Sequence, residues 1–333
     1  GNINKIEDNS QRSCIISGIR NNINNSFNSF IGSGAQNTIS LSINTFIGSA
    51  VSSKINNSDY SGIITGSSND ISNSIYSVIN GGNDNIISGG YNNIIGNGRL
   101  NKILLSWYSF IGSGGINKII GDEILNTPSY FSFIGSGGLI DIELTNYGFI
   151  GNGFECSLNN SNYSSIINGI NNKILNSTYC IISGGDNNII DSNSNYSIIG
   201  CGNINKIEDN SQRSCIISGT QNNIKNSLNS FIGSGEINTI SLSSNTFIGS
   251  AISSEINNTS DKSAIISGKN NNITLTESGF IGNGLDCSLN NSDYSNIGNG
   301  RNNTIKNTSL SVINGGDNNI IDSSSNYSII GCG

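Results

Sequence analysis

The residues best suited to chemistry in this 333-residue chain are its aromatic side chains, because their spacing is regular. Nine of the eleven tyrosines lie six residues before a Gly that recurs about every sixteen residues, and Phe131 takes the same place once. These positions lie an odd number of residues from the apolar Ile positions of the repeat. Because side chains alternate in direction along a strand, we predict that the rings point outward. Exposed rings can stack on sugars, bury against a neighbouring chain or stiffen their own stack, and all three interpretations stay open here. The set comprises Tyr60, Tyr76, Tyr108, Phe131, Tyr147, Tyr163, Tyr179, Tyr196, Tyr294 and Tyr327.

The seven cysteines do not show the spacing of a redox or zinc site, because the sequence contains no Cys-x-x-Cys. Six of them occupy three pairs of equivalent places in a long internal repeat, so the members of a pair lie many turns apart and cannot form a disulfide within the chain. We therefore expect inert, buried thiols. The pairs are Cys14 and Cys215, Cys156 and Cys287, and Cys201 and Cys332, while Cys180 stands alone.

The amino-acid composition excludes several kinds of catalytic and metal-binding site. The chain has no His, which excludes a Ser-His-Asp triad, a Cys-His pair and a His-ligated metal. The Gly-Asp-Asn-Asn stretches at Gly185 and Gly316 lack the nonapeptide pattern of calcium-binding rolls. A carbohydrate-active solenoid, such as a pectin lyase-like enzyme, is the competing hypothesis, but it requires clustered Asp, Lys or Arg on one face. We expect no enzymatic activity, no cofactor and no metal.

Charge also limits the partners. The chain has 15 basic and 22 acidic residues and a net charge of −7, which does not indicate a nucleic-acid partner. We expect no membrane insertion. The frequent Ile opposes disorder, because these side chains can bury a large apolar surface.

The recurring Gly marks a repeat that must position these residues. We call this Gly, or the Ala that replaces it at positions 50 and 251, the landmark of the repeat. Of the nineteen intervals between successive landmarks, fourteen are 16 residues long, four are 17 and one is 23. All twenty residues three places before the landmark are Ile, and a second column five places after it is Ile or Leu. These columns predict the core, which begins with Ile15, Ile31, Ile47, Ile63, Ile79, Ile95, Ile111 and Ile134.

The repeat predicts an all-β fold, because short β-branched runs punctuated by Gly favour strands. Each turn should contain two short strands and two bends, with Asn and Ser forming ladders between turns. We predict a parallel β-solenoid, or β-roll, of about twenty 16-residue turns, forming a trimeric fibre. The eight-residue spacing of Ile leaves one alternative, an intertwined triple-stranded β-helix with octad repeats.

A longer period organises the whole chain. Residues 1–18 recur unchanged at 202–219, and the second copy is 70 residues shorter in its middle. The 70 missing residues correspond to four whole repeats. A solenoid can lose whole turns because the remaining turns still stack in phase. We therefore predict one continuous solenoid over 1–333, with a first repeat copy at 1–201 and a shortened copy at 202–333. The 23-residue interval predicts a surface loop over 121–131, which contains the only Pro.

The run Ser-x-Ile-Gly-Ser-Gly-x-x-Asn-x-Ile, as in residues 29–39 and 109–119, resembles the head repeats of trimeric autotransporter adhesins. Similar repeats occur in phage tail fibres and giant-virus surface fibres. The resemblance covers almost the whole chain and implies a left-handed β-roll that trimerises. The period is longer than in the adhesins, and Ile replaces their Ala and Val.

These observations together predict a structural segment of a fibre or filament, with an adhesive role as an option. We expect an extracellular, cell-surface or virion-surface location and a homotrimer, with a host-surface glycan or protein as a further partner. The alternatives are a monomeric surface-layer or matrix solenoid and a glycan-binding solenoid.

Overall fold

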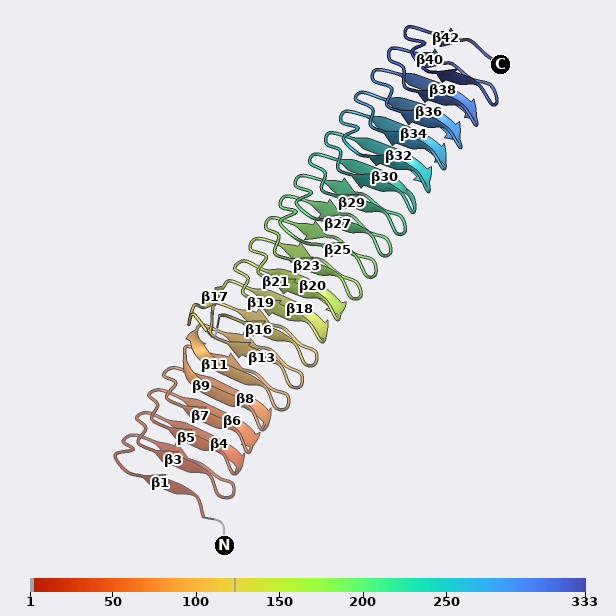
Figure 1. The fold of residues 1–333 in the computed structure, drawn as a ribbon. Coiled ribbons are helices and arrows are strands. Elements are labelled where there is room, and N and C mark those ends of the chain that lie inside the picture. Colours follow the sequence, from red (N-terminus) through yellow and green to blue (C-terminus); the bar gives the residue numbers. More distant parts are fainter. Residues whose placement is uncertain (1–2, 123) are drawn as a thin grey trace. The chain divides into compact units, whose positions relative to one another are not determined.

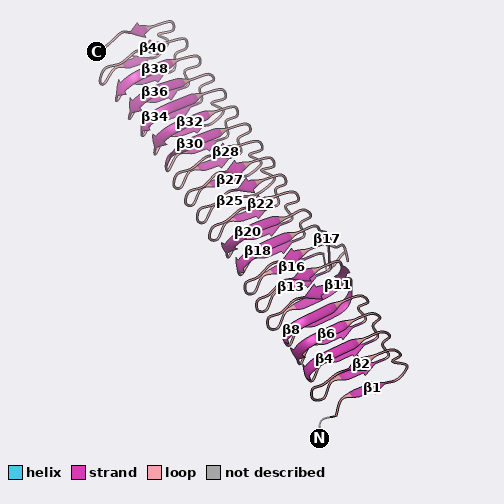
Figure 2. Ribbon diagram, turned by 180° about the vertical axis from the view of Figure 1, so that it is seen from behind, coloured by secondary structure: helices cyan, strands magenta, loops and turns pink. Residues whose placement is uncertain are grey.

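A computed structural model describes residues 3–122 and 124–333, and these residues contain strands and bends but no helix (Figures 1 and 2). The chain divides into two compact units, Gly1–Gly169 and Ile170–Gly333. Each unit is a parallel β-solenoid, and the two together comprise about twenty turns of about sixteen residues. The predicted all-β fold, a parallel solenoid of about twenty turns, is therefore confirmed. Within the described ranges, no helix could cross a bilayer.

In unit 1, successive turns place their strands on two faces. The first face contains β1 (Lys5–Glu7), β3 (Asn22–Asn24), β5 (Thr38–Ser40), β7 (Lys54–Asn56), β9 (Asp70–Ile75), β11 (Ile86–Tyr91), β13 (Lys102–Leu104), β14 (Ser106–Trp107), β16 (Lys118–Ile120), β17 (Ser129–Tyr130), β19 (Asp141–Glu143) and β21 (Ser157–Asn159). The second face contains β2 (Cys14–Ile15), β4 (Phe30–Ala35), β6 (Phe46–Val51), β8 (Gly62–Ser67), β10 (Val78–Ile79), β12 (Ile94–Ile95), β15 (Phe110–Ile111), β18 (Phe133–Gly138), β20 (Phe149–Phe154) and β22 (Ser165–Ile166).

Unit 2 repeats this plan. Its first face contains β23 (Lys173–Leu175), β25 (Ile189–Ile190), β27 (Lys206–Glu208), β29 (Asn223–Lys225), β31 (Thr239–Ser241), β33 (Glu255–Asn257), β35 (Asn272–Thr274), β37 (Ser288–Asn290), β39 (Thr304–Lys306) and β41 (Ile320–Asp322). Its second face contains β24 (Ile181–Ile182), β26 (Ile198–Ile199), β28 (Cys215–Ile216), β30 (Phe231–Glu236), β32 (Phe247–Ile252), β34 (Ala264–Lys269), β36 (Phe280–Leu285), β38 (Asn296–Arg301), β40 (Val312–Ile313) and β42 (Ile329–Ile330).

Strands one turn apart pair in parallel and in register. Ile31 of β4 lies opposite Ile47 of β6, sixteen residues later in the same chain. The backbone N–H of Cys14 donates to the carbonyl of Ser29 at 2.9 Å, and similar bonds join most successive turns. The pairing period is therefore one complete turn rather than the octad of the alternative architecture.

The Ile columns form the core of each unit. Seven of the eight named core residues of unit 1, from Ile31 to Ile134, have no exposed surface. Ile15 is only half-buried, because it lies in the first described turn and has a neighbouring turn on one side. Burial of one such side chain contributes roughly 1.5–3 kcal/mol, so the columns account for much of the cohesion between turns.

A buried column of asparagines runs beside the Ile columns and confirms the predicted Asn ladder. Asn101 has no exposed surface, and its Nδ2 donates to the carbonyl oxygens of Gly114 at 3.0 Å and Asn97 at 3.2 Å. Its Oδ1 accepts the backbone N–H of Asn117, one turn further, at 3.1 Å. Each such Asn therefore satisfies buried backbone groups in two turns, as buried polar groups require.

Serines form a second internal ladder. The backbone N–H of Ser42 donates to Oγ of Ser26 at 3.3 Å, and Ser58 repeats the bond to Ser42 at 3.1 Å. Each hydroxyl also donates within its own turn, as Ser58 does to the carbonyl of Asn56 at 2.8 Å. The hydroxyl thus closes a bend and joins two turns at once.

Three corners of each turn are held by residues in the left-handed conformation. Ser52, Asn57 and Tyr60 are the three in one turn, with φ of 54°, 47° and 52°. Asn tolerates this conformation better than most residues, which explains why it is frequent at the corners. The recurring Gly of the repeat also takes a positive φ in most turns, as Gly66 does at +105°, and Gly89 holds one of these corners at +65°.

Changes in turn length are confined to one of these corners. In the 17-residue turns the extra residue extends the corner, where two left-handed residues follow each other, as in Ser192 and Asn193 (φ 56° and 62°) and in Ser323 and Ser324 (φ 46° and 66°). The 23-residue turn carries its insertion there too. It occupies 122–128, narrower than the expected 121–131, because Ser129 and Tyr130 of β17 keep their pairing with β14.

Candidate functional site

The predicted aromatic positions gather at one corner of the turns in unit 1. Seven successive turns each place a ring there, and neighbouring ring centroids are 4.7–5.8 Å apart. We call this set the aromatic ladder. Its members are Tyr60, Tyr76, Tyr91, Tyr108, Phe131, Tyr147 and Tyr163. Four of the six contacts are stacked, and the two that involve Tyr91 are edge-on.

Tyr91 bridges a gap that the sequence left in this column. The column position in that turn is Asn92, and Tyr91 lies one residue earlier. Its ring nevertheless meets Tyr76 at 5.2 Å and Tyr108 at 5.8 Å. Strict spacing could not identify Tyr91, because in a straight strand a residue one place away would face the opposite side. The chain bends at the corner, and the ring of Tyr91 therefore contacts those of Tyr76 and Tyr108.

Two more rings widen the ladder on one side. Trp107 lies 6.2 Å from Tyr91 and 5.5 Å from Tyr130, and its side chain is 42% exposed. Both Trp107 and Tyr130 immediately precede a member of the ladder in sequence. The sequence signal that could have identified them is this adjacency of two aromatic residues.

In unit 2 the predicted tyrosines form a shorter group. Tyr179 and Tyr196 stack at 5.0 Å with nearly parallel rings. Tyr294 and Tyr327 are exposed at the same corner, but Leu310 occupies the turn between them. Unit 2 therefore has one stacked pair of rings and two separate rings, whereas unit 1 has an unbroken ladder.

Six members of the ladder are about half exposed, and the seventh, Tyr91, is partly buried. Tyr147 has 46% of its surface accessible, and Phe131 has 48%. Tyr147 also holds a left-handed backbone, at φ 56°, in a column where other turns use Asn. That conformation costs a bulky residue roughly 1–2 kcal/mol, while ring stacking returns about 0.5–1.5 kcal/mol per pair. Stacking alone thus roughly offsets the backbone cost and leaves a large apolar surface open to a partner.

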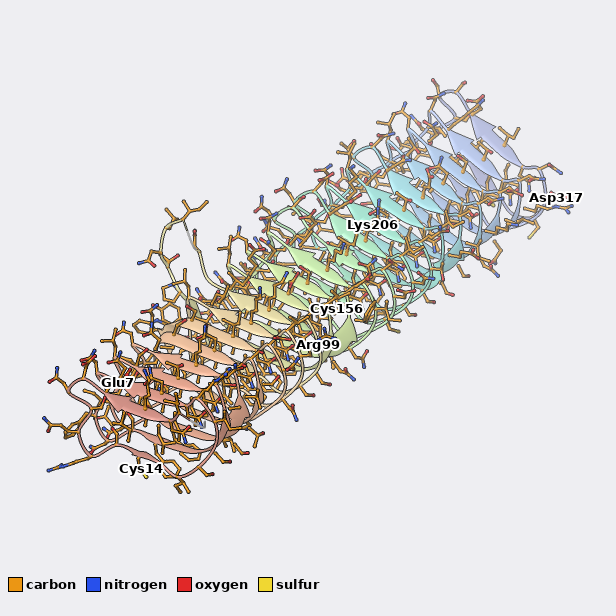
Figure 3. All side chains as sticks on the ribbon, turned by 90° about the horizontal axis from the view of Figure 1, so that it is seen from below. Glu7, Cys14, Arg99, Cys156, Lys206 and Asp317 are labelled. Atoms are coloured by element: carbon orange, nitrogen blue, oxygen red, sulfur yellow. The ribbon has the colours of Figure 1, made fainter. Side chains whose placement is uncertain are left out.

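The cysteines divide into two groups, and the expectation of buried thiols is wrong for one of them. Cys156, Cys180 and Cys287 are buried, whereas Cys14, Cys201 and Cys332 are exposed (Cys14 and Cys156 are labelled in Figure 3). Cys14 lies in β2 on the second face, whereas Cys201 and Cys332 lie outside the strands, shortly after β26 and β42, and Cys215 is intermediate. No disulfide joins any of the seven.

Two buried cysteines take the place of Asn in the internal ladder. The thiol of Cys156 donates to the carbonyl oxygen of Gly169 at 3.4 Å, and that of Cys287 donates to Gly300 at 3.5 Å. In other turns an Asn Nδ2 makes this bond. Burial raises the pKa of the Cys287 thiol, and it raises that of Cys180 from 9.0 to about 11.

Thiol modification should follow this division. At pH 8, iodoacetamide is expected to label Cys14, Cys201 and Cys332 first and Cys180 last, because the reagent needs an accessible thiolate. Because the pKa of Cys180 is higher in the folded chain than in the unfolded one, its contribution to stability is present below about pH 9 and is lost as the pH rises toward about 11. Peptide mass spectrometry of timed samples measures the order. Labelling of Cys180 as fast as Cys14 would contradict the assignment.

Other features offer little for ligand chemistry. Residues 3–122 and 124–333 contain no group of three or more Cys, Asp and Glu side chains placed to hold a metal. A hollow of about 200 Å³ beside the insertion is lined by Asp122, Pro128 and Leu144 among others. It is smaller than the roughly 300–1,000 Å³ typical of small-molecule sites, whereas a hollow of about 430 Å³ lined by Asn9, Phe27 and Ile43 among others falls within that range. The aromatic ladder, which spans seven turns, is the most extensive candidate surface.

Comparison with known proteins does not assign this chain to a family. No protein-family model matches the chain, and no curated protein matches it. One solved structure, described as a "putative acetyltransferase" from Desulfovibrio desulfuricans G20, aligns with 67% of this chain at 11% identity and a TM-score of 0.16. The alignment spans 65% of that structure's own chain. A likeness of this degree says nothing about the chemistry of this chain.

Proposed function

We propose that this chain is a non-catalytic structural segment of an extracellular or virion-surface fibre, in which three copies associate side by side through the aromatic ladder. The observation that carries the proposal is the unbroken run of rings over seven successive turns of unit 1, of which six are about half exposed and Tyr91 is partly buried. Tyr and Trp are enriched at protein interfaces, and a contiguous apolar surface indicates a contact site.

The construction of each unit suits a mechanical role. Within each unit, successive turns are joined by parallel strand pairing and by the Ile columns, and in most turns also by the buried Asn and Ser ladders. The energy is spread evenly over nearest neighbours, as in other solenoids. The resemblance of the Ser-x-Ile-Gly-Ser-Gly repeat to trimeric autotransporter adhesin heads and to viral fibres supports the trimer and the surface location.

The aromatic ladder also supports a second candidate function. Stacked, exposed Tyr rings are suitable for contact with the apolar faces of sugars, so a glycan-binding solenoid that stays monomeric would use the same surface. The two functions differ in whether the rings are covered by another copy. Their predictions for the molar mass in solution are therefore opposite.

Light scattering of the 333-residue chain tests the proposal. We expect a mass of about three chains, and a mass of about one chain after the triple change Tyr108→Ser, Phe131→Ser and Tyr147→Ser. The rings are outside the core, so the far-ultraviolet circular dichroism should not change. Burial of the rings on association is the physical reason for the loss.

A matched control uses stacked aromatic residues on another part of the same turns, where Phe149 is exposed and Phe133 is partly exposed. Phe133 and Phe149 stack at 5.3 Å on the second face, so the double change Phe133→Ser and Phe149→Ser should leave a mass of three chains. A mass of one chain for the unmodified protein would reject the trimer. Glycan binding that is lost in the triple variant would then support the glycan-binding function.

A further inference from the structure

The aromatic positions at the corner are selective for tyrosine rather than for aromatic rings in general. We call the positions six residues before the landmark the corner column. It contains nine Tyr and one Phe, whereas the outward column of the second face, four residues before the landmark, contains eight Phe and no Tyr. Stacking does not explain this choice, because Phe131 stacks on both of its Tyr neighbours, at 4.9 and 5.2 Å. The corner column is therefore distinguished by its phenols, which give up an electron and a proton far more readily than a phenyl ring does.

Three pairs of these tyrosines stack between adjacent turns. Within a pair the ring centroids are 4.7–5.0 Å apart, and the ring planes differ by 2–16°. Two of the pairs belong to the aromatic ladder of unit 1, and the third lies in unit 2. The pairs are Tyr60 with Tyr76, Tyr147 with Tyr163, and Tyr179 with Tyr196.

The backbone holds the two members of a pair in equivalent positions. The N–H of Tyr196 donates to the carbonyl of Thr178, the residue before Tyr179, at 3.0 Å. The N–H of Tyr76 makes the same bond to Asp59, the residue before its own partner, also at 3.0 Å. Tyr179 and Tyr196 share a left-handed backbone, with φ of 58° and 59°. Their side chains therefore leave the chain in the same direction, and the parallel rings bring their ortho carbons side by side.

The rings of a pair are open to a reagent in solution and have room to move. Tyr179 is 47% exposed and Tyr196 is 54% exposed. The turns that carry them are joined beside the corner by the strand pairing of Ile181 with Ile198. A closer approach of the two ortho carbons therefore requires only a tilt of the rings and no change in the stack of turns.

We propose that these pairs are sites of oxidative phenol coupling, which joins adjacent turns of one chain through a carbon–carbon bond. A one-electron oxidant removes one electron and one proton from each of the two phenols, and the two tyrosyl radicals combine at their ortho carbons. The hydrogen on each of these carbons then moves to the oxygen of its own ring, which restores both phenols. A peroxidase is the class of oxidant required, because hydrogen peroxide takes up the two electrons and two protons and forms two molecules of water.

The coupling would add covalent links to a contact that otherwise depends on hydrogen bonds and packing. Each link closes a loop of one turn and keeps that turn from separating from its neighbour at the corner. The inference goes beyond the function proposed above and does not depend on the trimer, because both rings of a pair belong to one chain.

Photo-oxidation with ruthenium tris-bipyridyl and persulfate, followed by peptide mass spectrometry, tests the pairing. We expect the peptides of Tyr179 and Tyr196 to be joined, with a mass two hydrogen atoms below the sum of the separate peptides. Tyr294 and Tyr327 lie two turns apart, with Leu310 between them, and should couple on the order of tenfold less, because proximity sets the rate. Equal coupling of the two pairs would overturn the proposal, and so would oxidation of Tyr179 and Tyr196 without coupling.

A new pair can be made at the gap in unit 2. Leu310 has φ of 57°, and its N–H donates at 3.0 Å to the carbonyl of Asp293, the residue before Tyr294, which is the bond found in the tyrosine pairs. Leu310→Tyr is therefore expected to stack on Tyr294 and to couple with it. The matched control is Leu310→Phe, which can stack but has no phenol and should give no coupled product at Tyr294. Failure of Leu310→Tyr to couple, in a chain where the native pairs do, would overturn the geometric explanation.

The outcome can be separated from that of the trimer. A light-scattering mass of one chain rejects the trimer, yet the coupled peptides of Tyr179 and Tyr196 should still form within that chain. A mass of three chains without these coupled peptides rejects only the phenol coupling.

Discussion

Replacing Gly66 with Ala is expected to destabilise the turns around it by about 3 kcal/mol, because two effects add. Gly66 has φ of +105°, which L-residues rarely adopt. An added Cβ would also overlap the carbonyl oxygen of Gly82 and lie 2.7 Å from Nδ2 of Asn69. Denaturant unfolding of the full chain, with hydrogen exchange of β8 and β10 as the local readout, measures the loss.

The chain itself supplies the compensating change. In the two turns where Ala replaces this Gly, at Ala50 and Ala251, the residue three places later is Ser rather than Asn, and neither Ala has a positive φ. The smaller Ser leaves room for the methyl group. We therefore expect Asn69→Ser to recover at least half of the stability lost in Gly66→Ala.

The control for this prediction lies in the same turn. A Cβ added at Gly62 would meet only the carbonyl oxygen of Phe46, at an ordinary 3.6 Å, and other turns carry Phe, Val or Ile in this column. Gly62→Ala should be neutral or stabilising by up to about 1 kcal/mol. A loss for Gly66→Ala no larger than that of Gly62→Ala would refute the steric explanation.

The second large effect is expected at the buried Asn ladder. In Asn101→Ala the backbone N–H of Asn117 loses its acceptor and stays buried, which costs about 1–3 kcal/mol in addition to the cavity. Amide exchange at Asn117 should accelerate on the order of 100-fold, since about 1.4 kcal/mol corresponds to a tenfold change.

A conservative variant separates the hydrogen bond from the change in volume. Ser53 occupies this column naturally, and its Oγ accepts the backbone N–H of Asn69 at 3.2 Å. Asn101→Ser should therefore keep exchange at Asn117 within about tenfold of the unmodified chain. Equal acceleration in Asn101→Ala and Asn101→Ser would show that packing, rather than the acceptor, is the important contribution.

The fold could be predicted from the sequence because its strongest signals are local and repeated. Ile at one place in all twenty repeats identifies an inward column, and Asn at another predicts a ladder. The left-handed corners were not apparent, because Tyr, Ser and Leu adopt them beside Asn. Only the stacking of whole turns imposes that conformation, so single-residue preferences could not show it.

The candidate site was predictable to the extent that it obeys the period. Tyr108, Phe131 and Tyr147 share one column and were expected to stack, and their rings lie 4.9 and 5.2 Å apart. Tyr91 and Trp107 lie one residue out of phase and join the rings only because the chain bends at the corner. The exposure of Cys14 was also unexpected, because its column holds apolar residues and apolar columns suggest burial. In the structure this column points away from the core.

The corner that absorbs every change in turn length has a consequence for evolution and for engineering. The seven inserted residues at 122–128 leave the strand pairs on either side of them in register, as the pairing of Trp107 with Tyr130 demonstrates. A foreign peptide grafted between Gly121 and Ser129 would occupy the same place without displacing a core side chain. This corner is thus a display site, where new recognition sequences can be added to a scaffold that does not have to change to accommodate them.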